Sequence, residues 1–211
     1  MKKNTFLYIL RLSLTLLAIT AIMAAALAGV NKLTAGKIAD ITKEKTDTAI
    51  ANVLPNVRYI EDVTEGFKSS RSLEVPELIR KIYFGFNKPQ TCLIEPGMTR
   101  GFAGCAIEVG PSGFDGEISL MVGISNEGKV TGISIISHTE TAGLGAVAAA
   151  ENDKGQVFRD QFVGMSGHLA ITKDGGDVDA ITGATVTSRA ITEGVNQALE
   201  FYEYLHERGI F

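Results

Sequence analysis

The residue types and spacing that point most directly to chemistry lie within residues 179–188. Small residues and hydroxyls gather there, directly before a segment of helical periodicity. A helix N-terminus offers unpaired N–H groups and a partial positive charge, so it stabilises a phosphate without a basic side chain. No lysine follows Gly183, which excludes a nucleotide P-loop. The stretch predicts a phosphate site, and the simpler alternative is that Thr182 or Thr185 only caps the helix.

A second stretch of interest, residues 138–145, reads His-Thr-Glu-Thr-Ala-Gly-Leu-Gly. His138 and Glu140 are two residues apart and would share one face of a strand, but no third group accompanies them, which disfavours an acid/base dyad. The glycines predict a tight loop against which a planar ligand can lie. Residues 113–116 allow two interpretations: a plain hairpin loop, or a backbone segment against which a planar ligand can lie.

The two stretches together resemble the family of FMN-binding domains in which a flavin transferase esterifies FMN to the last threonine of a motif like Asp-Ala-Ile-Thr-Gly-Ala-Thr. That threonine is Thr185 here, and Thr182 stands where the family more often has serine. In the loop, Ala142 replaces the family's usual proline. The resemblance implies one covalent FMN on Thr185. It also implies cofactor contacts from Thr182, Gly183, Ala184, Glu140, Thr141 and Leu144.

The N-terminal part of the chain has the composition of a membrane span. Residues 12–30 carry no charge, and these nineteen residues form about 28 Å of helix, close to the thickness of a bilayer core. Lys2, Lys3 and Arg11 precede them, so the positive-inside rule keeps the N-terminus in the cytoplasm. Residues 26–28 resemble a signal-peptide cleavage site, but the apolar run is longer than the usual apolar h-region of a signal peptide. We expect a single-pass anchor in the cell (inner) membrane and an extracytoplasmic domain, periplasmic if an outer membrane is present.

Charge and cysteine content narrow the classes of function. The formal net charge is −4, and three of the 20 basic residues lie within residues 1–30, which leaves 17 against 24 acidic residues and a net charge of −7 beyond. This balance argues against nucleic acid as a partner. Cys92 and Cys105 have neither a CxxC spacing nor a neighbouring histidine, so no metal site is expected. They are either two unrelated thiols or, in an exported domain, a disulfide.

The remaining elements follow from periodicity and from turn residues. We expect a stalk helix over residues 34–54, ended by Pro55, a short helix over 156–163, and a long helix after Thr185 that stops at Gly209. Residues 88–100 read as a loop. The expected strands are 57–63, 81–87, 102–109, 117–124, 130–137 and 168–173. The long helix should bury Ile191, Val195, Ala198, Tyr202 and Leu205, and its polar face should carry Glu193, Asn196, Gln197, Glu200, Glu203 and Glu207.

These elements predict an α+β fold: a single N-terminal transmembrane helix followed by an FMN-binding domain with an antiparallel sheet and flanking helices. The expected divisions are a cytoplasmic N-terminus (1–11), the transmembrane helix (12–30), a stalk helix with a peripheral part of the domain (31–90) and the FMN-binding core (91–211).

The order of anchor, loop and threonine motif resembles the G subunits of Rnf-type ion-translocating ferredoxin:NAD oxidoreductase complexes. The resemblance implies an electron-carrying subunit without a catalytic side chain or a metal, in a complex that couples electron transfer to Na⁺ or H⁺ translocation. The implied partners are the other membrane and peripheral subunits and a flavin transferase. The C subunits of Na⁺-translocating NADH:quinone reductases are the nearest alternative. A different class is an extracytoplasmic binding or adaptor domain that holds another anion and has no redox role.

Overall fold

The computed structural model describes residues 2–70, 73–87 and 101–211. It divides the chain into two compact units, Met1–Lys45 and Thr46–Phe211. The loop predicted over residues 88–100 lies outside the described residues, as does Cys92. Cys105 is a free, buried thiol, which agrees with the alternative of two unrelated thiols and not with a disulfide.

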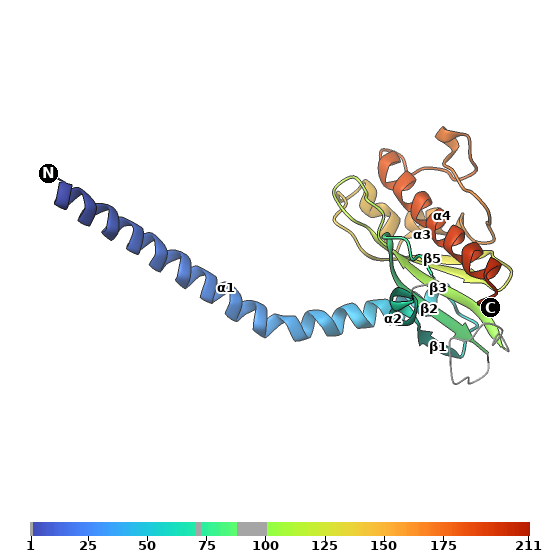
Figure 1. The fold of residues 1–211 in the computed structure, drawn as a ribbon. Coiled ribbons are helices and arrows are strands. Elements are labelled where there is room, and N and C mark those ends of the chain that lie inside the picture. Colours follow the sequence, from blue (N-terminus) through green and yellow to red (C-terminus); the bar gives the residue numbers. More distant parts are fainter. Residues whose placement is uncertain (1, 71–72, 88–100) are drawn as a thin grey trace. The chain divides into compact units, whose positions relative to one another are not determined.

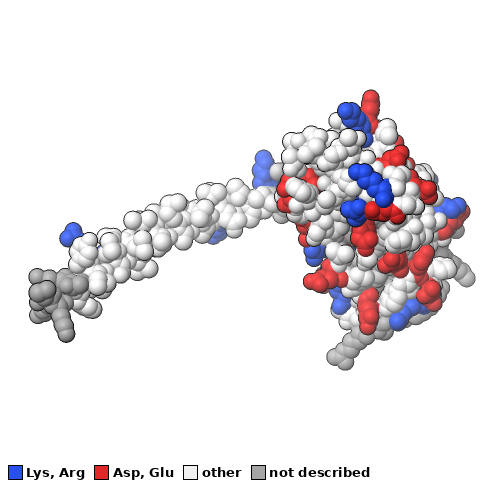
Figure 2. Space-filling model, turned by 90° about the horizontal axis from the view of Figure 1, so that it is seen from above, with Lys and Arg blue, Asp and Glu red and all other residues white. Residues whose placement is uncertain are grey.

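Helix α1 (Lys2–Val53) is continuous over 52 residues. Its part Phe6–Val53 is long and apolar enough to cross a membrane. All side chains from residue 6 to residue 45 are exposed, and Figure 2 shows most of this helix as a white surface without charge. Such a surface suits lipid rather than water. The helix ends directly before Leu54 and Pro55, as the position of the proline predicts.

The globular unit is built on an antiparallel sheet of five strands in the order β1-β2-β3-β4-β5. The sheet is a meander because each strand pairs with the next along the chain (Figure 1). One short helix, α2 (Thr64–Ser69), which the sequence did not predict, connects the first two strands. The strands are β1 (Tyr59–Asp62), β2 (Ile79–Phe86), β3 (Phe102–Val109), β4 (Ser119–Ser125) and β5 (Val130–Ser137), which confirms five of the six predicted strands.

Helix α4 (Thr185–Glu207) packs across β3 and β4 and covers one face of the sheet. The five side chains predicted for its buried face are all buried, and Gly209 follows its end with a left-handed φ of 66°. Asn196, which was predicted on the polar face, is instead 2% exposed. Its side chain accepts the N–H of Leu169 and donates to the carbonyl of Leu169, both at 2.8 Å.

The prediction of a sixth strand over residues 168–173 is wrong. The segment contains only an isolated bridge between Ile171 and Val178, followed by the 3₁₀ helix η2 (Thr172–Asp174). The physical reason is that Asn196 of α4 satisfies the N–H and C=O of Leu169, the groups that a strand would offer to a neighbouring strand.

The short helix predicted over 156–163 is α3 (Asp153–Asp160). It begins three residues earlier than predicted because the Asn152 side chain caps it by accepting the N–H of Gly155 at 3.0 Å. A second 3₁₀ helix, η1 (Gly145–Ala149), connects the loop at 138–145 to this region.

The opposite face of the sheet packs against the last turns of α1, residues that belong to the globular unit. Ala49, Ile50, Val53 and Leu54 share an apolar cluster with side chains of β2 to β5. A Cβ on Gly123 would lie 2.5 Å from the carbonyl oxygen of Val53, so only a glycine lets the helix end approach the strand this closely. That same carbonyl accepts the Thr131 hydroxyl at 2.5 Å.

Candidate functional site

A pocket of about 280 Å³ opens at the N-terminus of α4. Six of the seven residues predicted for the site line it: Glu140, Thr141, Leu144, Gly183, Ala184 and Thr185. The remaining lining residues are Phe114, Gly145, Lys173, Val186 and Thr187. Thr182, the seventh, is exposed and lines a neighbouring pocket with Lys154 and Val157. The fold thus brings two stretches that are about forty residues apart in the sequence to one place.

Helix α4 begins at Thr185 without a side-chain cap. Its N-cap residue is Ala184, and no side chain among the described residues caps the helix there. Neither Thr182 nor Thr185 has the capping role that the sequence left open. Gly183 makes the turn before the helix with a φ of 80°. The Ser188 hydroxyl holds this turn in place, since it accepts the N–H of Ile181 and donates to the Ala184 carbonyl, both at 3.0 Å.

Glu140 is the buried charge of the site, with 7% of its surface exposed. Its Oε1 accepts the backbone N–H groups of Phe114 and Asp115 at 2.8 and 3.1 Å. Its Oε2 accepts the Thr187 hydroxyl at 2.5 Å. Glycines at 113 and 145 make room for this carboxylate, because a Cβ at either position would collide with it. Glu140 therefore ties the 113–116 loop, its own loop and the first turn of α4 together.

Asp115 also holds the loop at 138–145. The Thr141 hydroxyl donates to Asp115 Oδ2 at 2.5 Å, and the Thr139 hydroxyl donates to the Asp115 carbonyl at 3.0 Å. Among the described hydrogen bonds, Glu140 accepts from Phe114, Asp115 and Thr187 and not from His138. Nδ1 of His138 is buried without a partner.

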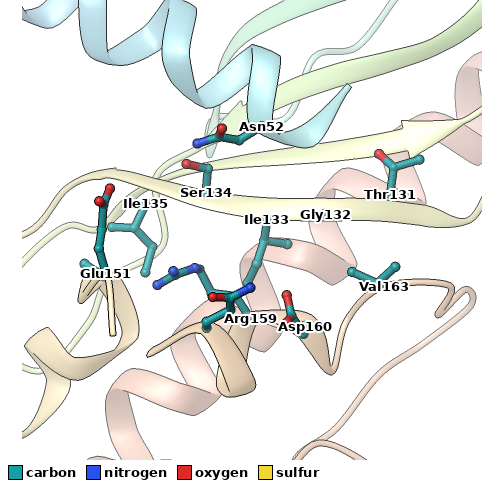
Figure 3. Close-up of a pocket in the computed structure, with 12 residues that line it drawn as sticks. Asn52, Thr131, Gly132, Ile133, Ser134, Ile135, Glu151, Arg159, Asp160 and Val163 are labelled. Atoms are coloured by element: carbon teal, nitrogen blue, oxygen red, sulfur yellow. The ribbon is translucent and has the colours of Figure 1, made fainter. Parts of the chain in front are cut away.

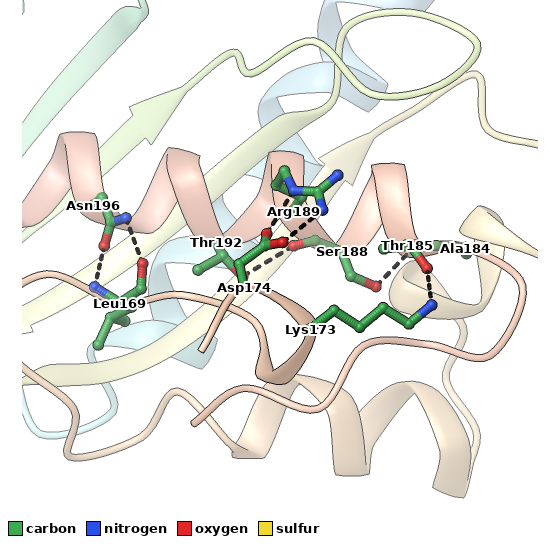
Figure 4. A network of polar contacts seen from close by, with 9 residues as sticks. All are labelled: Leu169, Lys173, Asp174, Ala184, Thr185, Ser188, Arg189, Thr192 and Asn196. Carbon is green, nitrogen blue, oxygen red and sulfur yellow. Dashed lines mark hydrogen bonds and ion pairs between the residues drawn. The ribbon is translucent and has the colours of Figure 1, made fainter. Parts of the chain in front are cut away.

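Lys173 is the charged site residue that the sequence did not reveal. Its Nζ lies 2.8 Å from Thr185 Oγ1 (Figure 4). It reaches the site from η2, where Asp174 accepts two hydrogen bonds from the Arg189 guanidinium at 2.7 and 2.9 Å. Residues 168–173 read as a strand, so no local signal placed this ammonium group beside the threonine.

Part of the exposed lining of the pocket is apolar. Phe114 is 70% exposed, and the side chains of Leu144 and Val186 are also exposed. A large exposed aromatic side chain costs free energy in water. A planar organic ligand that covers it would remove that cost.

A second pocket, of about 290 Å³, runs along β5 and α3 and is shown in Figure 3. It is polar, and one of its charged side chains, Arg159, donates to the carbonyls of Ala148 and Ala150 at 2.7 and 3.0 Å. None of the seven predicted site residues lines it. The pocket at the start of α4 is therefore the candidate site.

The family model described as FMN-binding domain matches residues 113–200, a range that contains every residue lining the candidate site. The chain is 35% identical over 209 residues to the G subunit of the Na(+)-translocating ferredoxin:NAD(+) oxidoreductase complex of Acetobacterium woodii, with 93% of each chain covered. It is 29% identical to the G subunit of the ion-translocating oxidoreductase complex of Shewanella baltica, over 96% of this chain and 89% of that one.

A shorter match has higher identity: 43% over 91 residues with the G subunit of the proton-translocating ferredoxin:NAD(+) oxidoreductase complex of Clostridium ljungdahlii, covering 42% of this chain and 47% of the other. Among solved structures, the C subunit of the Na(+)-translocating NADH-quinone reductase of Parabacteroides distasonis is similar at a TM-score of 0.45 and 16% identity, over 78% of this chain and 94% of that one. That score is too low to support an inference.

Proposed function

The chain belongs to the family of G subunits of ion-translocating ferredoxin:NAD oxidoreductase complexes, and from this premise we propose that it relays electrons through an FMN esterified to Thr185. It is a subunit of an oxidoreductase that translocates ions, and it contains an FMN-binding domain. The covalent bond, its position and the side of the membrane are the parts that we propose.

The observation that carries the proposal is the uncapped N-terminus of α4 with the Thr185 hydroxyl at its first position, inside a pocket. The N–H groups of a first helical turn and the helix dipole stabilise an anionic phosphate. A phosphodiester on Thr185 would place one there, and Gly183 itself adds no side chain beside the helix end.

The residues of the pocket fit FMN in their chemistry. The ammonium group of Lys173 and the start of α4 suit the phosphate, while Phe114, Leu144 and Val186 offer apolar surface for a planar ring system. A volume of about 280 Å³ is near the lower end of typical ligand pockets, which suits a site that holds a ligand only partly enclosed.

When bound, FMN supplies the redox chemistry, because it accepts and donates one or two electrons, whereas the protein supplies binding and orientation. Thr185 would hold the phosphate end. Glu140 would keep the 113–116 loop and the start of α4 at a fixed separation, through its hydrogen bonds to Phe114, Asp115 and Thr187. In this proposal no side chain of the chain is a catalytic acid, base or nucleophile, and Thr182, which faces the neighbouring pocket, contributes through the turn that it precedes.

We further propose that α1 anchors the subunit with the globular unit outside the cytoplasm. The basic residues Lys2, Lys3 and Arg11 lie at its start, which favours a cytoplasmic N-terminus. Residues 12–30 contain no ionisable side chain, so ion translocation would belong to partner subunits. A covalent bond keeps the cofactor from diffusing away in that compartment, since the bond replaces a concentration-dependent equilibrium.

Mass spectrometry of the full chain, purified from cells that contain a flavin transferase, tests the proposal. The expected result is a peptide whose mass is raised by that of FMN less one water, with fragmentation placing the group on Thr185. Thr185→Val, which removes only the hydroxyl, should give a folded chain without flavin. Thr42→Val, outside the globular unit, should retain the flavin. An unmodified Thr185 in cells with an active transferase would reject the covalent site and favour an anion-binding adaptor.

A further inference from the structure

Lys173 and Thr185 are in direct contact although nothing in the local sequence joins them. The ammonium nitrogen of Lys173 donates to Thr185 Oγ1 at 2.8 Å, and both residues line the pocket at the start of α4 (Figure 4). Among the described residues that line this pocket, Lys173 is the one with a positive charge. The position of this charge calls for an explanation.

The position is held by a clasp, which we define as the paired side chains of Asp174 and Arg189. Arg189 Nε and Nη2 donate to the two carboxylate oxygens of Asp174 at 2.7 and 2.9 Å. The hydrogen bond from Arg189 is the main reason why the pKa of Asp174 lies below its usual value. Arg189 is on α4, so the clasp fixes η2 to the helix that begins with Thr185. A two-pronged arginine–carboxylate pair defines geometry as well as adding attraction.

Elementary electrostatics gives this contact little value in the unmodified chain. A helix N-terminus carries a partial positive charge, and a lysine beside it is repelled. A hydrogen bond to the neutral hydroxyl of the half-buried Thr185 stabilises the chain only modestly, because it must offset the entropy lost in fixing a long, flexible side chain. The ammonium group becomes stabilising when an anion is bound at the same place, because the helix N-terminus and the ammonium group then both attract the anion.

We infer that Lys173 is the positioning residue of the attachment site: it orients the Thr185 hydroxyl for esterification and afterwards neutralises the phosphodiester. The inference rests on the proposed function. In the step, the Thr185 O–H bond breaks and its proton passes to a base of the transferase. The oxygen forms a bond to the flavin phosphorus of flavin adenine dinucleotide, and the phosphoanhydride bond breaks. Adenosine monophosphate leaves with the bonding electrons. Lys173 forms and breaks no covalent bond in this step.

The rate of attachment tests the first half of the role. Full-length chain in detergent, made in cells without the transferase, is incubated with purified transferase and flavin adenine dinucleotide, and attachment is followed by in-gel flavin fluorescence and intact mass. Lys173→Met should lower kcat about tenfold or more with the KM for the chain unchanged, because the hydroxyl is no longer oriented. Lys173→Arg should restore most of the rate. The matched control is Lys154→Met, on α3 beside the neighbouring pocket, and it should react like the wild type.

The melting temperatures of the unmodified and the flavin-loaded chain test whether Lys173 neutralises the phosphodiester. A purely structural role would lower the melting temperature of both forms of the variant. Unmodified Lys173→Met should melt at the same temperature as the wild type or up to about 2 °C higher, since the helix N-terminus loses a repelling charge. After attachment the order should reverse, and the flavin-loaded variant should melt below the loaded wild type. Added salt should shrink that difference.

The possible results distinguish a failure of the proposed function from a failure of the role of Lys173. Failure of the wild type to accept flavin on Thr185 would reject the proposed function. Equal kcat values for Lys173→Met and the wild type would reject only the role of Lys173, as would a raised KM with unchanged kcat, which would make Lys173 a docking contact for the transferase. If Lys173→Met does not fold, Arg189→Gln decides. This variant keeps the lysine but releases the clasp, and an unchanged kcat there would also overturn the inference.

Discussion

Replacement of Glu140 measures how strongly one buried carboxylate holds the site together. Glu140→Ala removes the acceptor of three hydrogen bonds, from the N–H groups of Phe114 and Asp115 and from the Thr187 hydroxyl. Glu140→Gln keeps the shape of the side chain and removes the charge. The two variants therefore separate the loss of the whole connection from the loss of its ionic part.

The loss of stability in each variant depends on which of the three hydrogen-bond donors can be solvated once the carboxylate is gone. Phe114 and Asp115 are exposed, so their N–H groups can be solvated after the change and the loss there is small. Thr187 is 2% exposed, and its hydroxyl would be left without an acceptor, at about 1–3 kcal/mol. With the lost methylene packing, about 0.8 kcal/mol per group, Glu140→Ala should cost about 3 kcal/mol. Glu140→Gln should cost about 1 kcal/mol, since hydrogen bonds to neutral groups are weaker.

Thermal unfolding of the purified full chain without flavin is the assay, followed by near-ultraviolet circular dichroism of the tyrosines. For a unit of this size, 1 kcal/mol corresponds to about 2–4 °C, so Glu140→Ala should melt about 6–12 °C below the wild type and Glu140→Gln about 2–4 °C below. The control is Glu117→Ala, whose carboxylate pairs with Arg80 in an exposed salt bridge at 2.7 Å and should contribute little. If Glu140→Ala melts at the same temperature as Glu117→Ala, the Glu140 carboxylate does not hold the three segments together.

Three further changes test other parts of the structure. Gly123→Ala should destabilise the globular unit by about 1–3 kcal/mol, because the new methyl group would collide with the Val53 carbonyl, and chemical denaturation would show no loss if the helix end moves away freely. In a Cys92→Ser chain, Cys105 should resist thiol reagents at pH 8 until the protein unfolds, since it is fully buried and burial raises the pKa of its thiol; rapid labelling of the native chain would contradict this. Phe114→Ala should leave flavin attachment to Thr185 intact but raise the quenching of flavin fluorescence by iodide, and unchanged quenching would show that the ring system does not lie against this side chain.

Local pattern determined much of the fold. The uncharged residues 12–30, the alternation in five strands and the periodicity after Thr185 each describe an element whose form depends on neighbours in the sequence. Because the backbone geometry of a helix places residues of one period on the same face, the buried side of α4 was predictable. The end of α1 was predictable from the position of Pro55. Two motifs, recognised by resemblance, identified six residues that line the same pocket.

Tertiary structure alone decided the contacts between segments. Asn196 is polar and was expected on the solvent side, yet it is buried because it satisfies the backbone of Leu169, and this pairing also replaces the strand expected there. The Glu140 carboxylate reaches Thr187, 47 positions later, and Lys173 reaches Thr185 through a clasp on α4. Periodicity gives the direction of each side chain along its own element, but the partner it meets depends on how elements pack. For that reason the sequence pointed to the threonine, and only the fold placed the ammonium group beside it.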